Sequence, residues 1–450
     1  MVEETFKYAA TPASSKVATA AWEAIQTCRE VYNHALTQEY RPRPKGSKPS
    51  YTSMQNKLPA WKEKWPEWSD VYSKTLQMAV RRIKQSESVL ESLKEKGYEV
   101  GQLQWKSPEE YRSIVYNQSG FDVDRNTDRT EHATVDFSKI GIFHLKYHRP
   151  LPEDGEISQI ILKKTKTGDW TVNIVVDYEP EYPEPPAIEE IDAENTVGID
   201  LGITSFIHDS TGRSFKSLDE QTDRERIERR HRNLSRKEYG SNNWEKARQK
   251  LAQAYKRLRN RRKDYREKLA HEYTTHYDAV FLEDLNVKSM IEGDRNSRNI
   301  AAMSWRKTIY AFKRHGEKNG CHVIEVPPAG TTKRCSQCGT ETAKPLWVRK
   351  HSCPACGFVA NRDYNSALEI KRLGLEKIGI RDSSVDIGQG MAESTSPELG
   401  EFWCANESPR DSLTPAETAL PGEAPSISPK RVVETGSPTL KEQTAAAVSE

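Results

Sequence analysis

The chain has 450 residues, 30% of them charged, and a formal net charge of +2 at pH 7. No apolar run approaches the roughly 18 residues that a membrane-spanning helix requires, so we expect a soluble protein with no membrane partner. Residues 1–7 lack the basic and apolar segments of a secretion signal, which predicts a cytoplasmic location.

The small net charge hides an uneven distribution. Residues 221–266 contain 17 basic and 6 acidic side chains, whereas residues 381–450 contain 5 basic and 12 acidic ones. A positive field of this density favours a polyanion as partner. On charge alone, however, a solvated helical face is the better explanation of the basic segment.

The N-terminal part of the chain has a helical pattern. Apolar residues at helical spacing predict one helix within residues 18–40 and a second at about 72–90, separated by a basic, proline-rich loop at 41–48. We interpret the tryptophans of this region as packing between helices rather than as platforms for stacked bases; they include Trp61, Trp65 and Trp68.

Short strands follow from about residue 105 to 178. The run Trp170–Tyr178 alternates in the manner of a strand, and a turn at Thr165–Asp169 joins it to Ile157–Lys164, which predicts a hairpin. Several such strands suggest a small antiparallel barrel. Residues 179–186 are rich in proline, which resists helix and sheet, so we expect a linker there.

After this linker the pattern becomes α/β. Strands are predicted at 196–201, 204–209, 278–283 and 321–326, and helices at about 220–276, 301–318 and 363–373. Beyond residue 378 few large apolar residues occur, and such a composition cannot bury enough surface to offset the entropy of ordering. We therefore expect residues 380–450 to be disordered.

Three acidic residues follow or end separate apolar segments: Asp200, Glu283 and Asp363. Each alone has an ordinary explanation, as a turn residue, a loop cap and the N-cap of the last helix, respectively. Jointly they favour metal chemistry, because parallel α/β sheets bind ligands at the carboxyl ends of strands and Mg²⁺ requires rigidly held oxygen ligands. We expect a two-metal site for phosphodiester hydrolysis.

Four of the seven cysteines occur as Cys335-Ser-Gln-Cys338 and, after fourteen intervening residues, as Cys353-Pro-Ala-Cys356, each pair followed by a glycine. Glycine permits the positive φ of a tight turn, so two such turns let four thiolates converge on Zn²⁺. Because no position is left open, the pattern predicts a structural zinc site rather than a catalytic one.

These motifs, in this order, closely resemble the OrfB or TnpB proteins that single-strand insertion sequences encode. The resemblance covers about residues 5–375. The segments that carry it are Cys28–Leu36, Ile140–Pro150, Gly198–Gly202, Leu282–Leu285, Thr331–Gly339, Cys353–Gly357 and Asn361–Ala367.

The resemblance implies a multidomain α+β fold. A wedge β-barrel interrupted by a helical recognition module precedes an RNase H-like (RuvC) α/β nuclease domain with an inserted zinc ribbon, and a disordered acidic tail follows. The implied divisions are 1–15 for the first part of the wedge barrel, 16–104 for the helical module, 105–186 for the wedge barrel and linker, 187–330 for the RuvC-like nuclease, 331–360 for the zinc-binding module, 361–378 for the third RuvC-like motif and 379–450 for the tail.

The resemblance also implies an activity. Asp200, Glu283 and Asp363 match the catalytic, Mg²⁺-binding triad of the family, and the four cysteines match its target-nucleic-acid-binding zinc module. Such proteins are RNA-guided endonucleases that cut double-stranded DNA beside a short transposon-associated motif, with a guide RNA derived from the transposon end. They are also described as transposases, acting in DNA transposition and recombination, and they resemble the ancestors of compact type V CRISPR nucleases.

A guided nuclease holds the guide–target duplex by its backbone, which requires many basic side chains. We therefore predict nucleic-acid contacts from Arg229, Arg230, Arg257, Arg261, Arg262, Lys333, Arg334 and Arg349. For the last three, which surround the cysteines, solvent-facing charge is an equal alternative.

Position 361 departs from the family, which commonly has aspartate where this chain has Asn361. A catalytically weakened nucleic-acid-binding protein that acts as a regulator is therefore the alternative function. A tyrosine transposase is less favoured, because His144 and His148 do not form a His-hydrophobe-His motif. A zinc-ribbon transcription factor would leave the acids and the basic helices unexplained.

Overall fold

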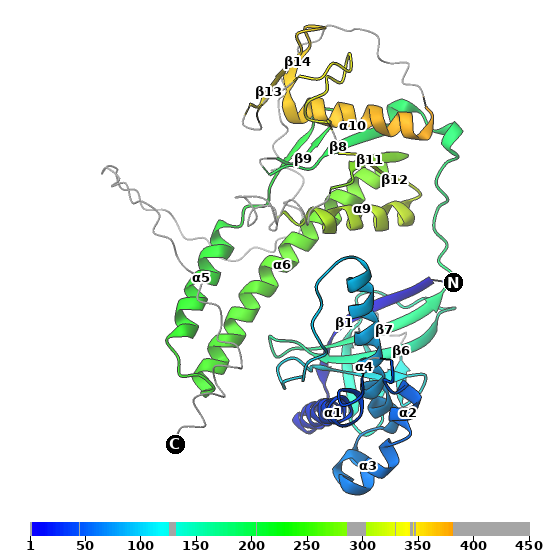
Figure 1. Cartoon of the computed structure of the whole chain (residues 1–450), viewed down its shortest axis with the longest axis vertical. Coiled ribbons are helices and arrows are strands. Elements are labelled where there is room, and N and C mark those ends of the chain that lie inside the picture. Colours follow the sequence, from blue (N-terminus) through cyan, green and yellow to red (C-terminus); the bar gives the residue numbers. More distant parts are fainter. Residues whose placement is uncertain are drawn as a thin grey trace. The chain divides into compact units, whose positions relative to one another are not determined.

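The computed structural model describes residues 2–44, 46–125, 132–203, 205–285, 303–328, 330–342, 345 and 348–380 (Figure 1). Most of the segment for which disorder was predicted, residues 381–450, lies outside these ranges. No helix in the described ranges combines the length and the apolar composition that crossing a lipid bilayer requires.

The strands of the N-terminal half are β1 (Val2–Pro12), β2 (Ser113–Asn117), β3 (Phe121–Asp124), β4 (His132–Phe137), β5 (Gly141–Lys146), β6 (Glu156–Lys164) and β7 (Trp170–Tyr178). Its helices are α1 (Ser15–His34), the π-helical η1 (Ala35–Tyr40), α2 (Tyr51–Gln55), α3 (Leu58–Lys64), the 3₁₀ turn η2 (Pro66–Asp70) and α4 (Ser73–Glu95).

The strands of the C-terminal half are β8 (Thr196–Asp200), β9 (Ser205–Asp209), β10 (Ser214–Lys216), β11 (Ala279–Glu283), β12 (His322–Val326), β13 (Lys350–Ser352) and β14 (Val359–Asn361). Its helices are α5 (Gln221–Ser235), α6 (Asn242–His276), α9 (Trp305–Asn319) and α10 (Arg362–Ile378), with two 3₁₀ turns at Ile188–Glu190 and Ala193–Asn195.

The N-terminal half is built on one curled antiparallel sheet of seven strands in the order β2-β6-β7-β1-β5-β4-β3. The hairpin predicted around residue 165 is present as β6 and β7, and Gly168 of its turn has a φ of +91°. Within the described residues, β2 and β3 each pair on one side only. In these residues the predicted barrel is a curled sheet with two edges.

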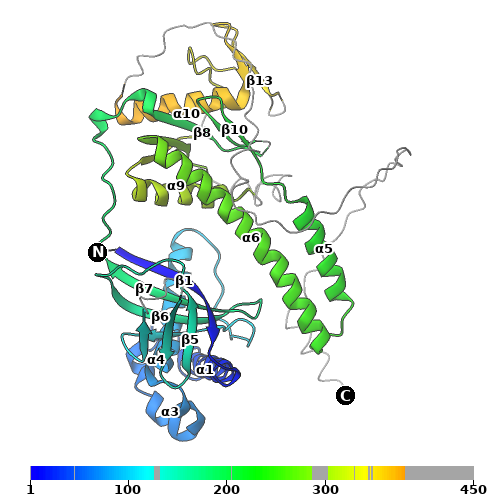
Figure 2. The ribbon, with the colours of Figure 1, turned by 180° about the vertical axis from the view of Figure 1, so that it is seen from behind.

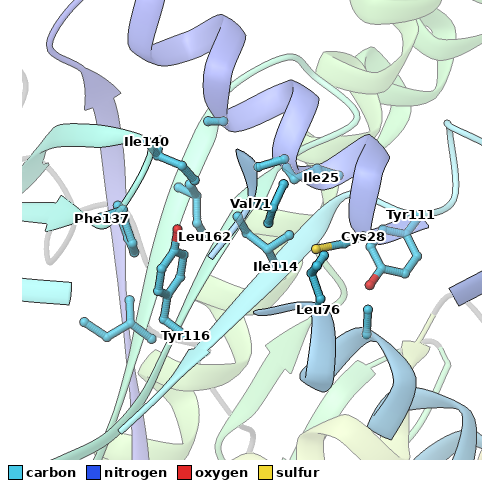
Figure 3. Packing of buried hydrophobic residues seen from close by; sticks show 14 of the residues in the cluster. Ile25, Cys28, Val71, Leu76, Tyr111, Ile114, Tyr116, Phe137, Ile140 and Leu162 are labelled. Carbon is cyan, nitrogen blue, oxygen red and sulfur yellow. The ribbon is translucent and has the colours of Figure 1, made fainter. Parts of the chain in front are cut away.

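Helices α1 to α4 lie between β1 and β2 in the chain and cover this sheet. Figure 3 shows Ile25 and Cys28 of α1 and Leu76 of α4 against Ile114 of β2 and Leu162 of β6, all of them buried. Ser14 caps α1, because its side chain accepts a hydrogen bond from the backbone N–H of Val17.

His34 of α1 contacts Trp61, Trp65 and Trp68 edge-on, with ring centroids 4.7–5.8 Å away. Trp61 and Trp68 are buried. The prediction that these tryptophans pack between helices is thus confirmed for these two residues.

The C-terminal half contains a second, mixed sheet in the order β10-β9-β8-β11-β12. Its first three strands are antiparallel neighbours, whereas β11 runs parallel to both β8 and β12. Parallel neighbours need long crossover connections. Helices α5 and α6 precede β11 in the chain, and α9 lies between β11 and β12 in the sequence.

Helices cover both faces of this second sheet. Tyr273 of α6 and Phe312 of α9 share one buried apolar cluster with Val280 of β11. Ile370 of α10 belongs to another cluster, together with Phe281 of the same strand. Because successive side chains of a strand point to opposite faces, α10 lies on one face and α6 and α9 lie on the other, as Figures 1 and 2 show.

Candidate active site and metal centre

Two of the predicted acids occupy the carboxyl ends of neighbouring parallel strands. Asp200 ends β8 and Glu283 ends β11. The two strands are in register with Ile199 opposite Leu282, which are the residues immediately before the acids. Both carboxylates therefore leave the sheet at the same edge, the edge at which parallel α/β sheets place their ligands.

Strand alternation also decides the face on which these acids lie. Ile199 and Leu282 belong to the apolar cluster on the α6 and α9 side, so Asp200 and Glu283, one residue later, belong to the α10 side. Asp363 stands in the first turn of α10. The sheet and this helix thus bring the three acids from separate parts of the sequence to one place.

A glycine makes the close approach of α10 possible. A Cβ atom added to Gly198 of β8 would lie 2.2 Å from the carbonyl oxygen of Ala367 and 2.5 Å from the backbone nitrogen of Lys371. Only a residue without a side chain fits where helix backbone meets strand backbone at this distance. The first glycine of the Gly-Ile-Asp-Leu-Gly motif therefore sets the spacing between β8 and α10.

The three carboxyl groups are buried and influence one another. Asp200, Glu283 and Asp363 are exposed by only 8%, 6% and 8%. Burial raises the pKa of Asp200 well above its usual range, and the charges of Glu283 and Asp363 raise it further, while Arg362 and Arg349 act in the opposite direction. The cluster thus resists carrying its full negative charge without a cation.

Three side chains support the acids. Thr331 donates a hydrogen bond of 2.5 Å from Oγ1 to Oε1 of Glu283, which partly offsets the rise that burial causes in the pKa of this carboxyl group. Asp363 forms ion pairs with Arg362 at 3.0 Å and with Arg349 at 3.3 Å. The contact from Thr331 favours the charged form of Glu283, and the two ion pairs hold the side chain of Asp363 between guanidinium groups.

The arrangement fits a divalent cation chemically, because buried carboxylate oxygens that repel one another are stabilised by a hard positive ion. It does not form a closed cage. In the part of the chain that the structure describes, the four cysteines are the only group of three or more His, Cys, Asp or Glu residues whose ligand atoms all lie within 4.8 Å of one another. The carboxylates form a more open cluster.

Asn361 has a structural role that the sequence alone did not indicate. Its side-chain oxygen accepts a hydrogen bond of 2.8 Å from the backbone N–H of Asp363, and it thereby caps α10. The N-cap that was considered for Asp363 is thus Asn361. Asparagine and aspartate are equally good N-caps, so the departure from the family preserves this function.

The four paired cysteines come together as their spacing predicts. Their sulfur atoms lie within 4.8 Å of one another, with 3.7 Å between Cys335 and Cys356 and 3.4 Å between Cys338 and Cys353. Four sulfurs at 2.3 Å from one zinc ion would be about 3.8 Å apart in a tetrahedron. The donor set and its spacing therefore fit Zn²⁺.

Two tight turns build this cysteine module. The backbone N–H of Gly339 donates to the carbonyl of Cys335, and that of Gly357 donates to the carbonyl of Cys353. Both glycines have positive φ, +72° and +74°. Strands β13 and β14 pair on either side of the second turn, and β14 leads directly into α10.

The sequence of this chain matches two family profiles and several known proteins. The profile of the OrfB family of IS605 elements, described as "Probable transposase", matches residues 173–293, and that of the Cas12f1-like TNB domain matches residues 305–370. A candidate RNA-guided DNA endonuclease of Streptomyces pristinaespiralis is 30% identical over 383 residues, which cover 83% of this chain and 90% of that protein. The chain belongs to the TnpB/OrfB family.

Other members of the TnpB/OrfB family and their CRISPR-associated relatives match smaller parts of the chain. The Escherichia coli K12 protein InsQ, also a candidate RNA-guided DNA endonuclease, is 27% identical over 54% of this chain and 63% of its own length. The Cas12f1 endodeoxyribonuclease of Sulfoacidibacillus thermotolerans is 27% identical over 49% of this chain and 54% of its length. A Cas12f1–sgRNA–target DNA complex superposes with a TM-score of 0.49 at 16% identity, over 79% of this chain and 82% of the other.

The basic residues predicted to contact nucleic acid on this TnpB/OrfB protein fall into two groups. Arg257 and Arg261 pair with Asp223, and Arg262 pairs with Glu220, at one end of the α5–α6 hairpin. The two acids are exposed by only 3% and 8%. These three guanidinium groups are therefore held by the hairpin itself.

Arg229 and Arg230 lie farther along α5, exposed and half-buried respectively. Lys333, beside the first cysteine turn, is exposed, and Arg334 pairs with Glu369 at 3.6 Å. Arg349 contacts Asp363 directly, so it lies beside the acids.

Proposed function

We propose that this TnpB/OrfB protein is an RNA-guided, Mg²⁺-dependent endonuclease that cuts DNA beside a transposon-associated motif. The observation that carries the proposal is the convergence of Asp200, Glu283 and Asp363, buried and mutually repelling, at one edge of a parallel sheet segment. The names of the relatives support the activity class, since two of them are described as candidate RNA-guided DNA endonucleases.

In this proposal Asp200, Glu283 and Asp363 hold Mg²⁺, which when bound activates water and stabilises the leaving oxygen in phosphodiester hydrolysis. Thr331 orients the carboxylate of Glu283. Arg349 and Arg362 place positive charge beside Asp363 and limit the repulsion within the metal-free cluster. Burial of the three acids excludes water that would otherwise weaken each of these interactions.

The proposal also assigns roles to the cysteine module, the two sheets and the N-terminal helices. Cys335, Cys338, Cys353 and Cys356 hold a structural Zn²⁺ in the module that faces target nucleic acid. The curled N-terminal sheet is the wedge domain, its helices are the recognition module, and the mixed sheet is the RNase H-like nuclease domain. A guide RNA from the transposon end supplies sequence specificity by base pairing, while basic side chains hold the duplex by its backbone.

Plasmid cleavage tests this proposal. The protein is purified together with its co-expressed guide RNA and incubated with Mg²⁺ and a plasmid that carries the matched target beside a library of flanking sequences. We expect linear product from the wild type and none from Asp200→Ala. Equal cutting by both proteins, or the absence of cutting by the wild type at every Mg²⁺ and Mn²⁺ concentration, would refute it.

A second candidate function is a nucleic-acid-binding regulator that does not cut. Its support is the pair of arginines on Asp363, because two guanidinium groups already neutralise the carboxylate that a metal ion would need. The same experiment separates the two functions. Specific retention of the target plasmid without strand scission is the result that favours the regulator.

A further inference from the structure

The peptide that leads into the first cysteine turn, residues 331–336, touches the acidic cluster. Thr331 is exposed by only 2%, and its hydroxyl lies 2.5 Å from Oε1 of Glu283. The same hydroxyl is 3.2 Å from the carbonyl oxygen of Pro328. A hydroxyl has one proton, and charge-assisted hydrogen bonds are shorter and stronger than neutral ones, so the carboxylate is its principal acceptor.

The same peptide is fastened to α10, the helix that carries Asp363. The side chain of Asn365 accepts a hydrogen bond of 3.1 Å from the backbone N–H of Ser336 and donates one of 2.8 Å to the carbonyl of Arg334. Asn365 is completely buried. Both ends of its amide are thus used to hold the two residues on either side of Cys335.

A charged contact reinforces this attachment. Arg334 lies 3.6 Å from Glu369, one turn farther along α10, and Glu369 is exposed by only 1%. Within six residues, the peptide therefore contacts three buried side chains, Glu283 of β11 and Asn365 and Glu369 of α10. It connects the cysteine module to two of the three elements that carry the acids.

We propose that Thr331 is a positioning residue that holds the carboxylate of Glu283 in its metal-binding orientation, and that Asn365 secures Thr331 by fixing the first cysteine turn to α10. This inference rests on the proposed function, since it assigns a role within the same site. It makes the cysteine module a supporting wall of the acidic cluster in addition to its proposed contact with nucleic acid.

Divalent-ion binding tests the proposal without requiring cleavage. Mn²⁺ alone is titrated calorimetrically into the purified, zinc-loaded full chain of the wild type, Thr331→Val and Thr331→Ser. Valine keeps the shape of threonine but removes the donor, whereas serine keeps the donor. We expect Thr331→Val to weaken Mn²⁺ binding by about 10- to 100-fold, the range typical of residues that orient a metal ligand, and Thr331→Ser to return it toward the wild-type value.

Thr342 supplies a matched control in the same module. Its hydroxyl has no hydrogen-bond partner among the described residues, so Thr342→Val removes an equivalent group that holds nothing. We expect this variant to bind Mn²⁺ like the wild type. The melting temperature and zinc content of all variants show whether the fold is retained.

The outcomes separate this inference from the proposed function. Equal Mn²⁺ affinity in Thr331→Val and the wild type overturns the positioning role even if the wild type cuts DNA. Equal losses in Thr331→Val and Thr331→Ser, or in Thr331→Val and Thr342→Val, also overturn it, because the hydroxyl would then not be the cause. A wild type that binds Mn²⁺ through the Thr331-dependent site but cuts no matched DNA would refute the proposed function alone.

Discussion

Substitution of Gly198 by alanine tests the reason for the close contact between β8 and α10. The new Cβ would lie 2.2 Å from the carbonyl oxygen of Ala367, 2.5 Å from the backbone nitrogen of Lys371 and 2.9 Å from its Cα. Ordinary van der Waals contact begins at 3.4 Å, and all three atoms belong to helix backbone, so no side-chain rotation relieves the clash. The helix as a whole must move away from the strand.

Overpacking of this kind costs about 1–3 kcal/mol of the free energy of unfolding. The displacement also carries Asp363 away from Asp200, and a misplacement of about 1 Å can lower a catalytic rate about 100-fold. Urea denaturation followed by tryptophan fluorescence measures the first effect, and single-turnover cleavage of matched DNA measures the second.

Gly101 provides the control for this substitution. A Cβ added there meets no heavy atom within 4 Å, so Gly101→Ala is expected to change the free energy of unfolding by less than about 0.5 kcal/mol. If Gly198→Ala is as stable and as active as Gly101→Ala, then α10 does not depend on a glycine at this position, and the account of the site's spacing is wrong.

Three further predictions concern charge and metal. Because the pKa of Asp200 is raised in the folded protein, its contribution to stability is largest below the ordinary carboxyl pKa of about 4 and is lost as the pH rises through the raised value. In buffer without divalent cations, Asp200→Asn should therefore melt at a higher temperature than the wild type at neutral pH, and a melting temperature at or below the wild-type value would contradict this. Cys335→Ser should reduce the zinc content from about one ion per chain, measured by elemental mass spectrometry, and unchanged content would exclude the four-cysteine site. Joint replacement of Arg229 and Arg230 by alanine should reduce the salt dependence of guide-RNA binding, measured by fluorescence anisotropy, by about 0.7 in the log–log slope for each lost phosphate contact, and an unchanged slope would show that neither residue contacts phosphate.

Local patterns in the sequence were sufficient to locate several of the strands and helices and to select candidate residues for metal chemistry. Strand β11 was predicted at 278–283 and is found at Ala279–Glu283, and the last helix was predicted to start at 363 and starts at Arg362. Such elements follow from side-chain periodicity, which depends on neighbours in the chain. The two cysteine turns could be predicted equally well, because each Cys-x-x-Cys turn depends only on residues that are neighbours in the chain.

The curled N-terminal sheet shows which features local sequence patterns do not predict. Hairpins such as β6–β7 follow from a turn between alternating strands, but the long pairing of β1 with β7 joins Val2 to Tyr178. No signal along the chain specifies that register, because it is selected by the burial of one face of the completed sheet. Whether the sheet closes into a barrel likewise depends on the tertiary packing of the completed sheet.

The sequence by itself determined that Asp200 and Glu283 end apolar strands, that Asp363 stands at the start of the last helix, and that four cysteines can share a metal. Only the tertiary structure decided that the acids lie on the α10 face, that Thr331 reaches Glu283, and that Arg261 is held by Asp223. The physical reason is that the partner of a side chain depends on how elements distant in the chain pack together. Burial increases the energetic importance of these partners, since a charge in the protein interior that has no partner lowers the stability of the fold.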